Sequence, residues 1–198
     1  MQLLIATHNP AKKKELTEGL LAVLPDCNIT SLDDLGITRD PEETGKTFEE
    51  NACLKATYYA AQSGLTTLAD DGGILIDALN GEPGVLSKRW LGRAATDQEL
   101  IDYCLKRMMG VPPEKRTARF TVVLCVVDPV TKNMTTVTES IEGFIAETSS
   151  KHWSPGFCYR AVFIVKQFNK YFDDLTQQEH EQINHRLIAL RRLAKKLL

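Results

Sequence analysis

Several features that mark large protein classes are missing from this sequence. The five cysteines lie far apart at Cys27, Cys53, Cys104, Cys125 and Cys158. No two of them have the two-residue spacing typical of zinc and redox sites, so we expect reduced, mostly buried thiols and a cytoplasmic location. No apolar run approaches the roughly 20 residues that a membrane span needs. Residues 3–6 are too few, and lack the basic flank, for a signal peptide.

The sequence also lacks an excess of charge of either sign. It carries 24 Lys and Arg against 26 Asp and Glu, for a net charge of −2, and the two signs are mixed along the chain. Residues 186–196 are rich in Lys and Arg, but leucines recur there at helical spacing, which predicts an ordinary amphipathic helix with a solvated face. We therefore expect neither a nucleic-acid partner nor a membrane partner.

The length and composition fit one domain, or one domain with two lobes. The chain has 198 residues and 43% hydrophobic content, enough for a real core. Three capping boxes begin at Thr47, Thr96 and Thr176. We predict strands over residues 2–7, 28–32, 66–69, 74–79, 116–127, 134–146 and 157–165, helices over 12–24, 47–62, 96–109 and 176–198, and a loop over 33–46. This order favours an α/β or α+β chain with a mixed sheet.

The most informative segment is the acidic stretch at residues 70–73. The predicted strand over residues 66–69 leads into Asp70, Asp71, Gly72 and Gly73, which we expect to form a turn. Carboxylates at the carboxyl end of a strand lie where open α/β sheets place ligand and metal chemistry. Because neighbouring strand residues point to opposite faces, only one of the two carboxylates can readily face a given ligand. A solvated acidic turn is the alternative.

A second polar group follows the first predicted strand. This group consists of Thr7, Asn9, Lys12 and Glu15. It places a hydroxyl, an amide and a cation at the start of a predicted helix, where such groups can bind an anion. An ordinary strand-to-helix turn with an exposed lysine run explains the same residues. Both interpretations stay open on these residues alone.

Residues 40–55 invite a phosphate-loop interpretation that fails. The first glycine of the G-x-x-x-x-G-K-[ST] pattern would fall at residue 40, which is aspartate, and no buried strand precedes it. Glu50, Asn51 and Lys55 have helical spacing and can either face one cleft or form a solvated stripe. Glu42 and Glu43 lie in the preceding loop.

Two clusters near the end of the chain suggest contacts with a base. Strand alternation would place Phe157 and Tyr159 on one face, where aromatic rings can stack a base, although core packing is the usual role of such residues. On the final predicted helix, His185 and Arg186 follow His180 by about one turn and can hold a phosphate or a base edge. A surface pair is the alternative.

Taken together, in this order and spacing, these clusters resemble the Ham1/ITPase family of pyrophosphatases that act on noncanonical purine nucleoside triphosphates. The family pattern Thr-x-Asn-x-x-Lys-x-x-Glu matches residues 7–15, and Glu-Asn-Ala-x-x-Lys-Ala matches residues 50–56. The acidic segment matches at residues 69–73 and is followed by matching residues 77–81 and 83–85. The resemblance runs from about Leu3 to Leu193, and four motifs in register make it specific.

The resemblance implies a fold, an activity and an assembly. The expected fold is an elongated mixed β-sheet with flanking helices and two lobes around a central cleft, as in ITPase and Maf proteins, with residues 1–198 forming a single two-lobed domain. The expected enzyme hydrolyses ITP, dITP and XTP to the monophosphate and pyrophosphate with a divalent metal, usually Mg²⁺. Homodimers are usual in the family.

The resemblance also assigns roles to residues. Asp71 matches the general base and a metal-associated carboxylate, and Glu43 falls at a second metal-associated position. Phe157 matches the base-stacking aromatic, and His185 with Arg186 matches the base-reading pair. The full set of expected substrate-binding residues is Thr7, His8, Asn9, Lys12, Lys55, Gly72, Phe157, Tyr159, Arg160, His180, His185 and Arg186.

The chain departs from the family pattern at positions around the base. Gly72 stands where serine is common, Arg160 replaces the aspartate of Phe-Gly-Tyr-Asp-Pro, and His180 and Asn184 replace a lysine and a serine. An arginine can only donate hydrogen bonds or stack, so Arg160 predicts a preference for bases with oxo acceptors, such as hypoxanthine and xanthine. Altered specificity is expected rather than a loss of activity. The alternatives are a pyrophosphatase of the same fold for another modified nucleotide and a noncatalytic nucleotide sensor.

Overall fold

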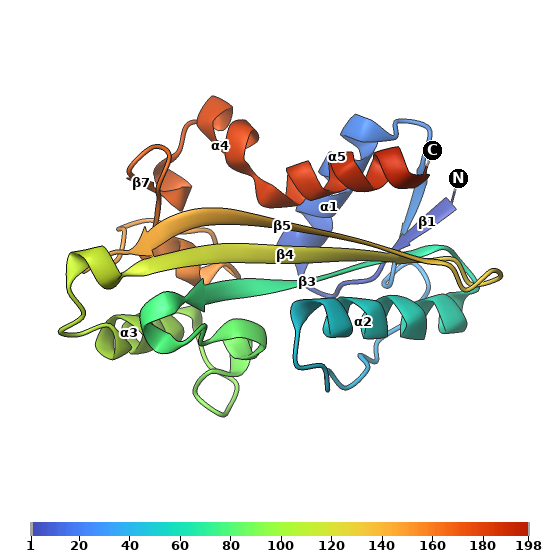
Figure 1. Ribbon diagram of the computed structural model, residues 1–198. Helices are drawn as coiled ribbons and strands as arrows, with labels where there is room; N and C mark the ends of the chain where they lie inside the picture. The colour runs from blue at the N-terminus through green and yellow to red at the C-terminus, as the bar shows by residue number, and fades with distance from the viewer. Residues whose placement is uncertain (1, 198) are drawn as a thin grey trace. The chain divides into compact units, whose positions relative to one another are not determined.

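The computed structural model describes residues 2–197, over which strands and helices alternate (Figure 1). The strands are β1 (Gln2–Ile5), β2 (Asn28–Ser31), β3 (Thr67–Ile76), β4 (Thr117–Val127), β5 (Met134–Ile145), β6 (Phe163–Val165) and β7 (Lys170–Tyr171). The α-helices are α1 (Pro10–Val23), α2 (Phe48–Ser63), α3 (Asp97–Arg107), α4 (Gln177–Ile183) and α5 (His185–Leu197). Short 3₁₀ helices include η1 (Asp77–Leu79), η2 (Gly84–Arg89), η4 (Cys158–Val162) and η5 (Phe172–Asp174).

The strands form one mixed sheet, which confirms the expected fold class. Over the described residues its seven strands have the order β2-β1-β3-β4-β5-β6-β7. β1 pairs in parallel with β2 and with β3, where Ile5 lies opposite Leu68. β5 and β6 are antiparallel, as are β6 and β7. The parallel strands are joined through helices α1 and α2, as parallel connections require.

The chain divides into two compact units, each with its own core. Unit 1 comprises the described residues up to Gly72, Val122–Glu139 and the residues from His185 onward. Its core joins β1, β3 and β4 to α1 and α5, with Leu3, Leu20 and Leu190 almost fully buried. In Figure 1, α1 and α5 lie on one side of β3 and α2 lies on the other. The expectation of a single two-lobed domain stays a prediction.

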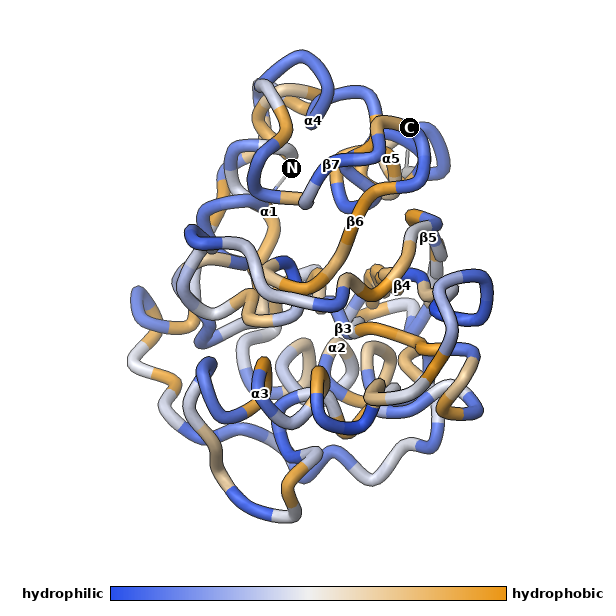
Figure 2. Tube along the Cα trace, turned by 90° about the vertical axis from the view of Figure 1, so that its left-hand side faces the viewer, coloured by the Kyte–Doolittle hydropathy of each residue, from blue (hydrophilic) through white to orange (hydrophobic). Residues whose placement is uncertain are grey.

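Unit 2 comprises Gly73–Thr121 and Ser140–Asn184. Its core gathers the second half of β3, α3, β6 and η4, with Ile101, Phe163 and Phe172 buried. Figure 2 shows apolar segments along the strands and polar ones in the outer loops, which is the pattern expected when apolar surface is removed from water.

Local signals in the sequence predicted most helix ends. The capping boxes at Thr47, Thr96 and Thr176 are all present, each with the threonine hydroxyl accepting from the N3 amide and the N3 glutamate accepting from the threonine amide. α2 ends at Gly64, whose φ of 68° is left-handed. α1 begins earlier than predicted, because Asn9 caps it and Pro10 occupies its first turn.

The cysteines and the membrane prediction can be compared with the structure. All five cysteines, which lie in the described part of the chain, are free thiols, and all except the half-buried Cys53 are buried. The expectation of mostly buried thiols is confirmed. Among residues 2–197, no helix combines the length and apolar character that crossing a bilayer requires.

The predicted acidic turn is wrong. β3 continues without interruption through Asp70, Asp71, Gly72 and Gly73 to Ile76, so the two expected strands are one. Neither glycine has a positive φ, and both take part in extended backbone. A Cβ on Gly73 would lie 3.0 Å from the Gly84 carbonyl oxygen and would also meet the Ser87 hydroxyl, so close packing requires this glycine.

Two predictions near the C-terminus are also wrong. Residues 158–162 form the 3₁₀ helix η4 in place of a strand, and only Phe163–Val165 pairs in the sheet, so strand alternation does not relate Phe157 to Tyr159. The single helix expected over residues 176–198 is two helices, because Asn184 leaves the helical region with ψ of 101°. The predicted end at Leu198 lies outside the described residues.

Candidate active site

The start of α1 places the first predicted cluster at the end of β1. The side-chain oxygen of Asn9 accepts hydrogen bonds from the amides of Ala11 and Lys12 at 2.9 and 3.2 Å. The Thr7 hydroxyl accepts from the Asn9 amide at 3.2 Å. These contacts satisfy backbone donors that a helix start leaves without partners, and they fix the position from which Lys12 projects.

Lys12 and Arg186 converge on Asp70. Lys12 Nζ lies 2.9 Å from Asp70 Oδ2, and Arg186 Nη2 lies 3.2 Å from the same oxygen. Arg186 also pairs with Glu15 of α1 through Nη1. Burial alone would raise the pKa of Asp70, but Lys12, Arg186 and Lys55 outweigh it and hold that pKa well below its usual value. The lowered pKa favours the ionised form of Asp70, and Asp70 and Glu15 together offset the charges of Lys12 and Arg186.

Asp71 faces a different lysine. Lys55 Nζ on α2 lies 3.1 Å from Asp71 Oδ1 and 2.9 Å from Glu43 Oε1 in the loop before α2. Burial raises the pKa of Asp71, and Glu43 raises it further, against the opposing effect of Lys55 and Lys12. Burial lowers the pKa of Lys55, but Asp71, Asp70 and Glu43 raise it above its usual value. One lysine thus holds two carboxylates together.

The alternation of β3 explains why neighbouring aspartates have different partners. Asp70 contacts side chains of α1 and α5, whereas Asp71 contacts a side chain of α2. Figure 1 shows these helices on opposite sides of β3. The rule that successive strand residues point to opposite faces therefore holds here. The continuous strand, rather than a turn, sets the two carboxylates into two separate charge clusters.

The donor set in unit 1 fits Mg²⁺ better than a structural metal. Among the described residues, no group of three or more His, Cys, Asp or Glu side chains is arranged to hold a metal ion. Asp71 and Glu43 do converge on one point, the Lys55 ammonium group. Mg²⁺ is commonly held by one or two carboxylates together with substrate phosphates and water, which is what this pair can supply.

The other predicted residues of this region have different partners. His8 Nε2 lies 3.8 Å from Asp40 Oδ1, which also accepts the Tyr59 hydroxyl at 2.5 Å. Asn51 is buried and accepts the Gly45 amide at 2.8 Å, while Glu50 completes the capping box of α2. Glu50, Asn51 and Lys55 therefore do not act together, and only Lys55 reaches the acidic cluster.

The aromatic cluster lies in unit 2. The guanidinium carbon of Arg160 is 3.7 Å from the centroid of the half-buried Phe157 ring and 4.4 Å from that of Phe172. Arg160 Nη1 lies 3.8 Å from Asp173 Oδ1. Tyr159 points into the core of unit 2, where its hydroxyl donates to the Ser87 carbonyl at 2.7 Å. Arg160 and Phe157 are thus in direct contact, and Tyr159 is a core residue.

The three histidine and arginine positions near the C-terminus fall on two helices. His180 belongs to α4 in unit 2 and meets the Phe172 ring edge-on, with centroids 5.2 Å apart. His185 and Arg186 begin α5 in unit 1 and are both buried. The structure brings Arg186 to the Asp70 cluster and His180 to the Arg160 cluster.

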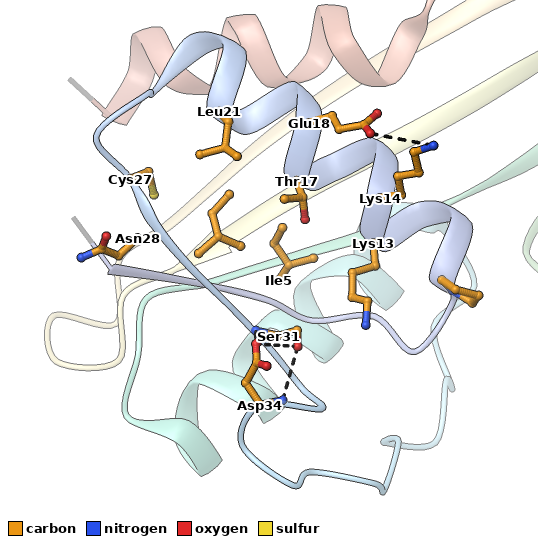
Figure 3. A pocket seen from close by; sticks show the side chains of 12 residues that line it. Ile5, Lys13, Lys14, Thr17, Glu18, Leu21, Cys27, Asn28, Ser31 and Asp34 are labelled. Atoms are coloured by element: carbon orange, nitrogen blue, oxygen red, sulfur yellow. Dashed lines mark hydrogen bonds and ion pairs between the residues drawn. The ribbon is translucent and has the colours of Figure 1, made fainter.

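A surface pocket of about 770 Å³ lies beside α1 and β2. Figure 3 shows Lys13, Lys14 and Asp34 around an apolar floor that includes Ile5 and Leu21. Lys14 pairs with Glu18, and Asp34 accepts the Ser31 hydroxyl. The lining found within the described chain includes none of the predicted site residues, so this pocket is separate from both clusters.

Sequence reasoning gave no role to three residues that the structure places at these clusters. Asp70 pairs with Lys12 and Arg186, Glu15 pairs with Arg186, and Asp173 pairs with Arg160. For Asp70 a signal existed, since the first carboxylate of the pair had to point away from the second. Asp173 lies 13 positions after Arg160, and no periodic pattern links them.

Comparisons with known proteins place the chain in a family. The model of the Ham1 family matches residues 3–196. A dITP/XTP pyrophosphatase from Bacillus subtilis is 42% identical over 196 residues, which cover 99% of this chain and 96% of that protein. A protein of the same name from Exiguobacterium is 42% identical over 198 residues, covering 100% of this chain and 97% of its own.

Solved structures of other proteins have a similar fold over the whole chain. A HAM1 protein from Coxiella burnetii superposes with a TM-score of 0.87 at 34% identity, covering 100% of this chain and 98% of that one. The Ham1 protein of Staphylococcus aureus gives 0.85 at 31% identity with the same coverage. With the family model spanning nearly all of its residues and these relatives matching it end to end, this chain belongs to the Ham1 family.

Proposed function

We propose that this protein hydrolyses the noncanonical purine nucleoside triphosphates ITP, dITP and XTP to the monophosphate and pyrophosphate. The observation that carries this proposal is the convergence of Lys12, Lys55 and Arg186 on the carboxylates of β3 within unit 1. Relatives named dITP/XTP pyrophosphatase, about 40% identical over the whole chain, support the substrate class. Removal of such nucleotides would cleanse the nucleotide pool.

Lys12 and Lys55 are the proposed phosphate ligands. A triphosphate carries about four negative charges, so its cleavage requires cations that neutralise charge and orient the leaving pyrophosphate. Both ammonium groups are largely buried and paired with carboxylates, which keeps them beside β3 before substrate binds. Thr7, His8 and Asn9 at the start of α1 and Gly72 on β3 are proposed as neighbouring substrate contacts.

Asp71 is the proposed general base. Its carboxylate would accept a proton from the attacking water as the new bond to phosphorus forms and the pyrophosphate leaves. Burial and Glu43 raise the pKa of Asp71, which makes it a better proton acceptor than an exposed aspartate. Lys55, 3.1 Å away, holds the carboxylate in place.

We further propose that Asp71 and Glu43 would hold Mg²⁺ together with the substrate phosphates. When bound, such an ion would neutralise phosphate charge and orient the leaving group. The two carboxylates meet at Lys55, so binding requires the Lys55 ammonium group to move toward a phosphate oxygen. This rearrangement would give Lys55 a phosphate partner in exchange for a carboxylate.

The remaining roles rest on the family resemblance. Phe157 is proposed to stack the base, with Arg160 and His180 near it in unit 2, and His185 with Arg186 to read the base, whereas Tyr159 is buried in the core and is no longer proposed as a contact. We also propose a homodimer, which light scattering after size-exclusion chromatography tests. A cytoplasmic location is proposed because the described thiols are all free, as in a reducing compartment.

A pyrophosphate-release assay across a nucleotide panel tests the function. We expect kcat/KM for ITP and XTP to exceed that for ATP by at least roughly tenfold, which corresponds to about 1.4 kcal/mol of transition-state binding. The panel includes modified pyrimidine triphosphates, each with Mg²⁺ and with EDTA. Turnover of only a modified pyrimidine would replace the proposed substrate class, and tight binding of ITP without pyrophosphate release would indicate a sensor.

A further inference from the structure

Four side chains of unit 2 form a continuous stack that ends at Phe157. Arg160 lies against both Phe157 and Phe172, with its guanidinium carbon 3.7 and 4.4 Å from the two ring centroids. The Phe172 ring then meets the His180 imidazole at an interplanar angle of 86°. We call Phe157, Arg160, Phe172 and His180 the aromatic column. Two of its members, Arg160 and His180, are positions where this chain departs from the family pattern.

The column is fixed by contacts to the backbone around Phe157. Asp173 faces Arg160 through Oδ1 and accepts the Ser154 amide through Oδ2 at 2.7 Å. The Phe157 amide donates to the Ser154 carbonyl at 3.1 Å, and the Arg160 amide donates to the Phe157 carbonyl at 2.9 Å. Arg160 and Asp173 therefore hold both the ring of Phe157 and the turn that carries it.

This geometry limits what Arg160 can do. The residue is 9% exposed, its guanidinium contacts two rings, and its Nη1 faces Asp173. A guanidinium over the face of an aromatic ring is attracted by the ring quadrupole, and the attraction grows when the pair is removed from water. Arg160 therefore lies directly against the Phe157 ring and constrains its orientation.

We propose that Arg160 is a positioning residue, which sets the plane of the Phe157 ring on which the base stacks and does not itself read the base edge. This role rests on the proposed function, in which Phe157 contacts the purine. It separates two properties of the pocket: Arg160 governs how strongly any purine stacks, and other groups govern which purine is preferred. The sequence-based prediction that Arg160 donates to oxo groups is the competing role.

A double-mutant cycle decides between the two roles. Binding of IMP, the expected product, is measured by calorimetry for the parent, Phe157→Ala, Arg160→Ala and the double variant. We expect Phe157→Ala to weaken IMP binding about tenfold and Arg160→Ala about fivefold. The double variant should match Phe157→Ala alone, because Arg160 acts through that ring. A double variant about 50-fold weaker, the product of the two effects, would overturn the proposal.

Base selectivity gives an independent readout. For Arg160→Ala we expect KM to rise by a similar factor for ITP, XTP and ATP, with the ratio of their kcat/KM values within about twofold of the parent ratio and kcat less affected than KM. A general structural defect would lower kcat at least as much as it changes KM, and so would not give this pattern. If the preference for ITP over ATP drops about tenfold, Arg160 reads the base and the proposal is wrong.

Control variants distinguish a loss of folding, or a failure of the proposed function, from a loss of the proposed Arg160 role. Arg119→Ala removes a partly exposed arginine of unit 2 that pairs with Asp77, and it should bind IMP like the parent. If Arg160→Ala does not fold, the same cycle is run with Arg160→Lys, which keeps a charge near Asp173 but loses the planar group. A parent that binds IMP without cleaving ITP refutes the proposed function, while the cycle still decides the role of Arg160. A parent that does not bind IMP overturns the proposed role.

Discussion

At the scale of single residues, charge balance is the main property of the site in unit 1. In the two charge clusters beside β3, the carboxylates of Glu15, Glu43, Asp70 and Asp71 pair with Lys12, Lys55 and Arg186. A triphosphate brings further negative charge into the same place. A bound metal ion would offset this added charge, which is the role proposed for Mg²⁺ above.

Asp71→Asn tests the proposed base. The change keeps the shape of the side chain and removes its charge, so turnover of ITP should fall by about 10²–10⁴-fold. Thermal unfolding followed by circular dichroism should remain cooperative. Asp102→Asn, which alters an exposed carboxylate on α3 that accepts from Gln98, is the matched control and should keep parental activity. Near-parental kcat in Asp71→Asn would remove this residue from the mechanism.

Lys12→Ala and Lys55→Ala test the proposed phosphate ligands. Each lysine supplies charge rather than a base contact, so both variants should weaken ITP binding far more than inosine binding. Lys14→Ala changes an exposed lysine of the same run, with a side chain 76% exposed, and should bind both ligands normally. Equal losses for ITP and inosine would mean that the lysines support the fold and not the phosphates.

The sequence predicted those site residues whose charge and motif position already suggest a role in binding or catalysis. Lys12, Lys55 and Asp71 were predicted as site residues, and in unit 1 the structure pairs Lys12 with Asp70 and Lys55 with Asp71. Asp70 received no role, because its partner Arg186 lies 116 positions away. Such a contact is decided by the packing of α5 against α1, which a single sequence does not record. Arg160 and Asp173 illustrate the same limit at shorter range.

At the scale of elements, the wrong predictions of secondary structure involve glycine and aromatic residues, which occur in more than one kind of element. Two consecutive glycines predicted a turn, yet Gly72 and Gly73 lie within β3, and Gly73 leaves room for Gly84 and Ser87 of η2. The alternating apolar residues after Phe157 predicted a strand, yet η4 buries Tyr159 and Arg160 together. Capping boxes were reliable because each depends on only four neighbouring residues.

Gly73→Ala tests the close approach between β3 and η2. The new methyl group would contact the Gly84 carbonyl oxygen and the Ser87 hydroxyl, so we expect a loss of about 1–3 kcal/mol in the free energy of unfolding. Chemical denaturation measures the change. The double variant Gly73→Ala/Ser87→Gly removes one of the two clashes and should recover part of the loss. If Gly73→Ala is as stable as the parent, β3 and η2 can separate at little cost.

At the scale of the whole molecule, the chain carries two hydrophobic cores, and each supports a different part of the chemistry. The core of unit 1 fixes β3 against α1 and α5, which determines where Lys12, Asp70 and Arg186 meet. The core of unit 2 includes Phe172 and Tyr159, which support η4 and the turn at Phe157. The mixed sheet and element order followed from periodicity, whereas the assignment of residues to units required the structure.

Removal of divalent ions tests whether metal serves the reaction or the fold. Lys55 already pairs with Asp71 and Glu43, and no group of three or more potential metal ligands occurs among residues 2–197. We therefore expect EDTA to shift Tm by less than about 2 °C. Turnover of ITP in EDTA should fall by at least about 100-fold and return on addition of Mg²⁺. A fall in Tm of more than about 5 °C would instead indicate a structural metal, whose binding energy would be part of the folding energy. Full activity in EDTA would show that Lys12 and Lys55 neutralise the triphosphate without an ion.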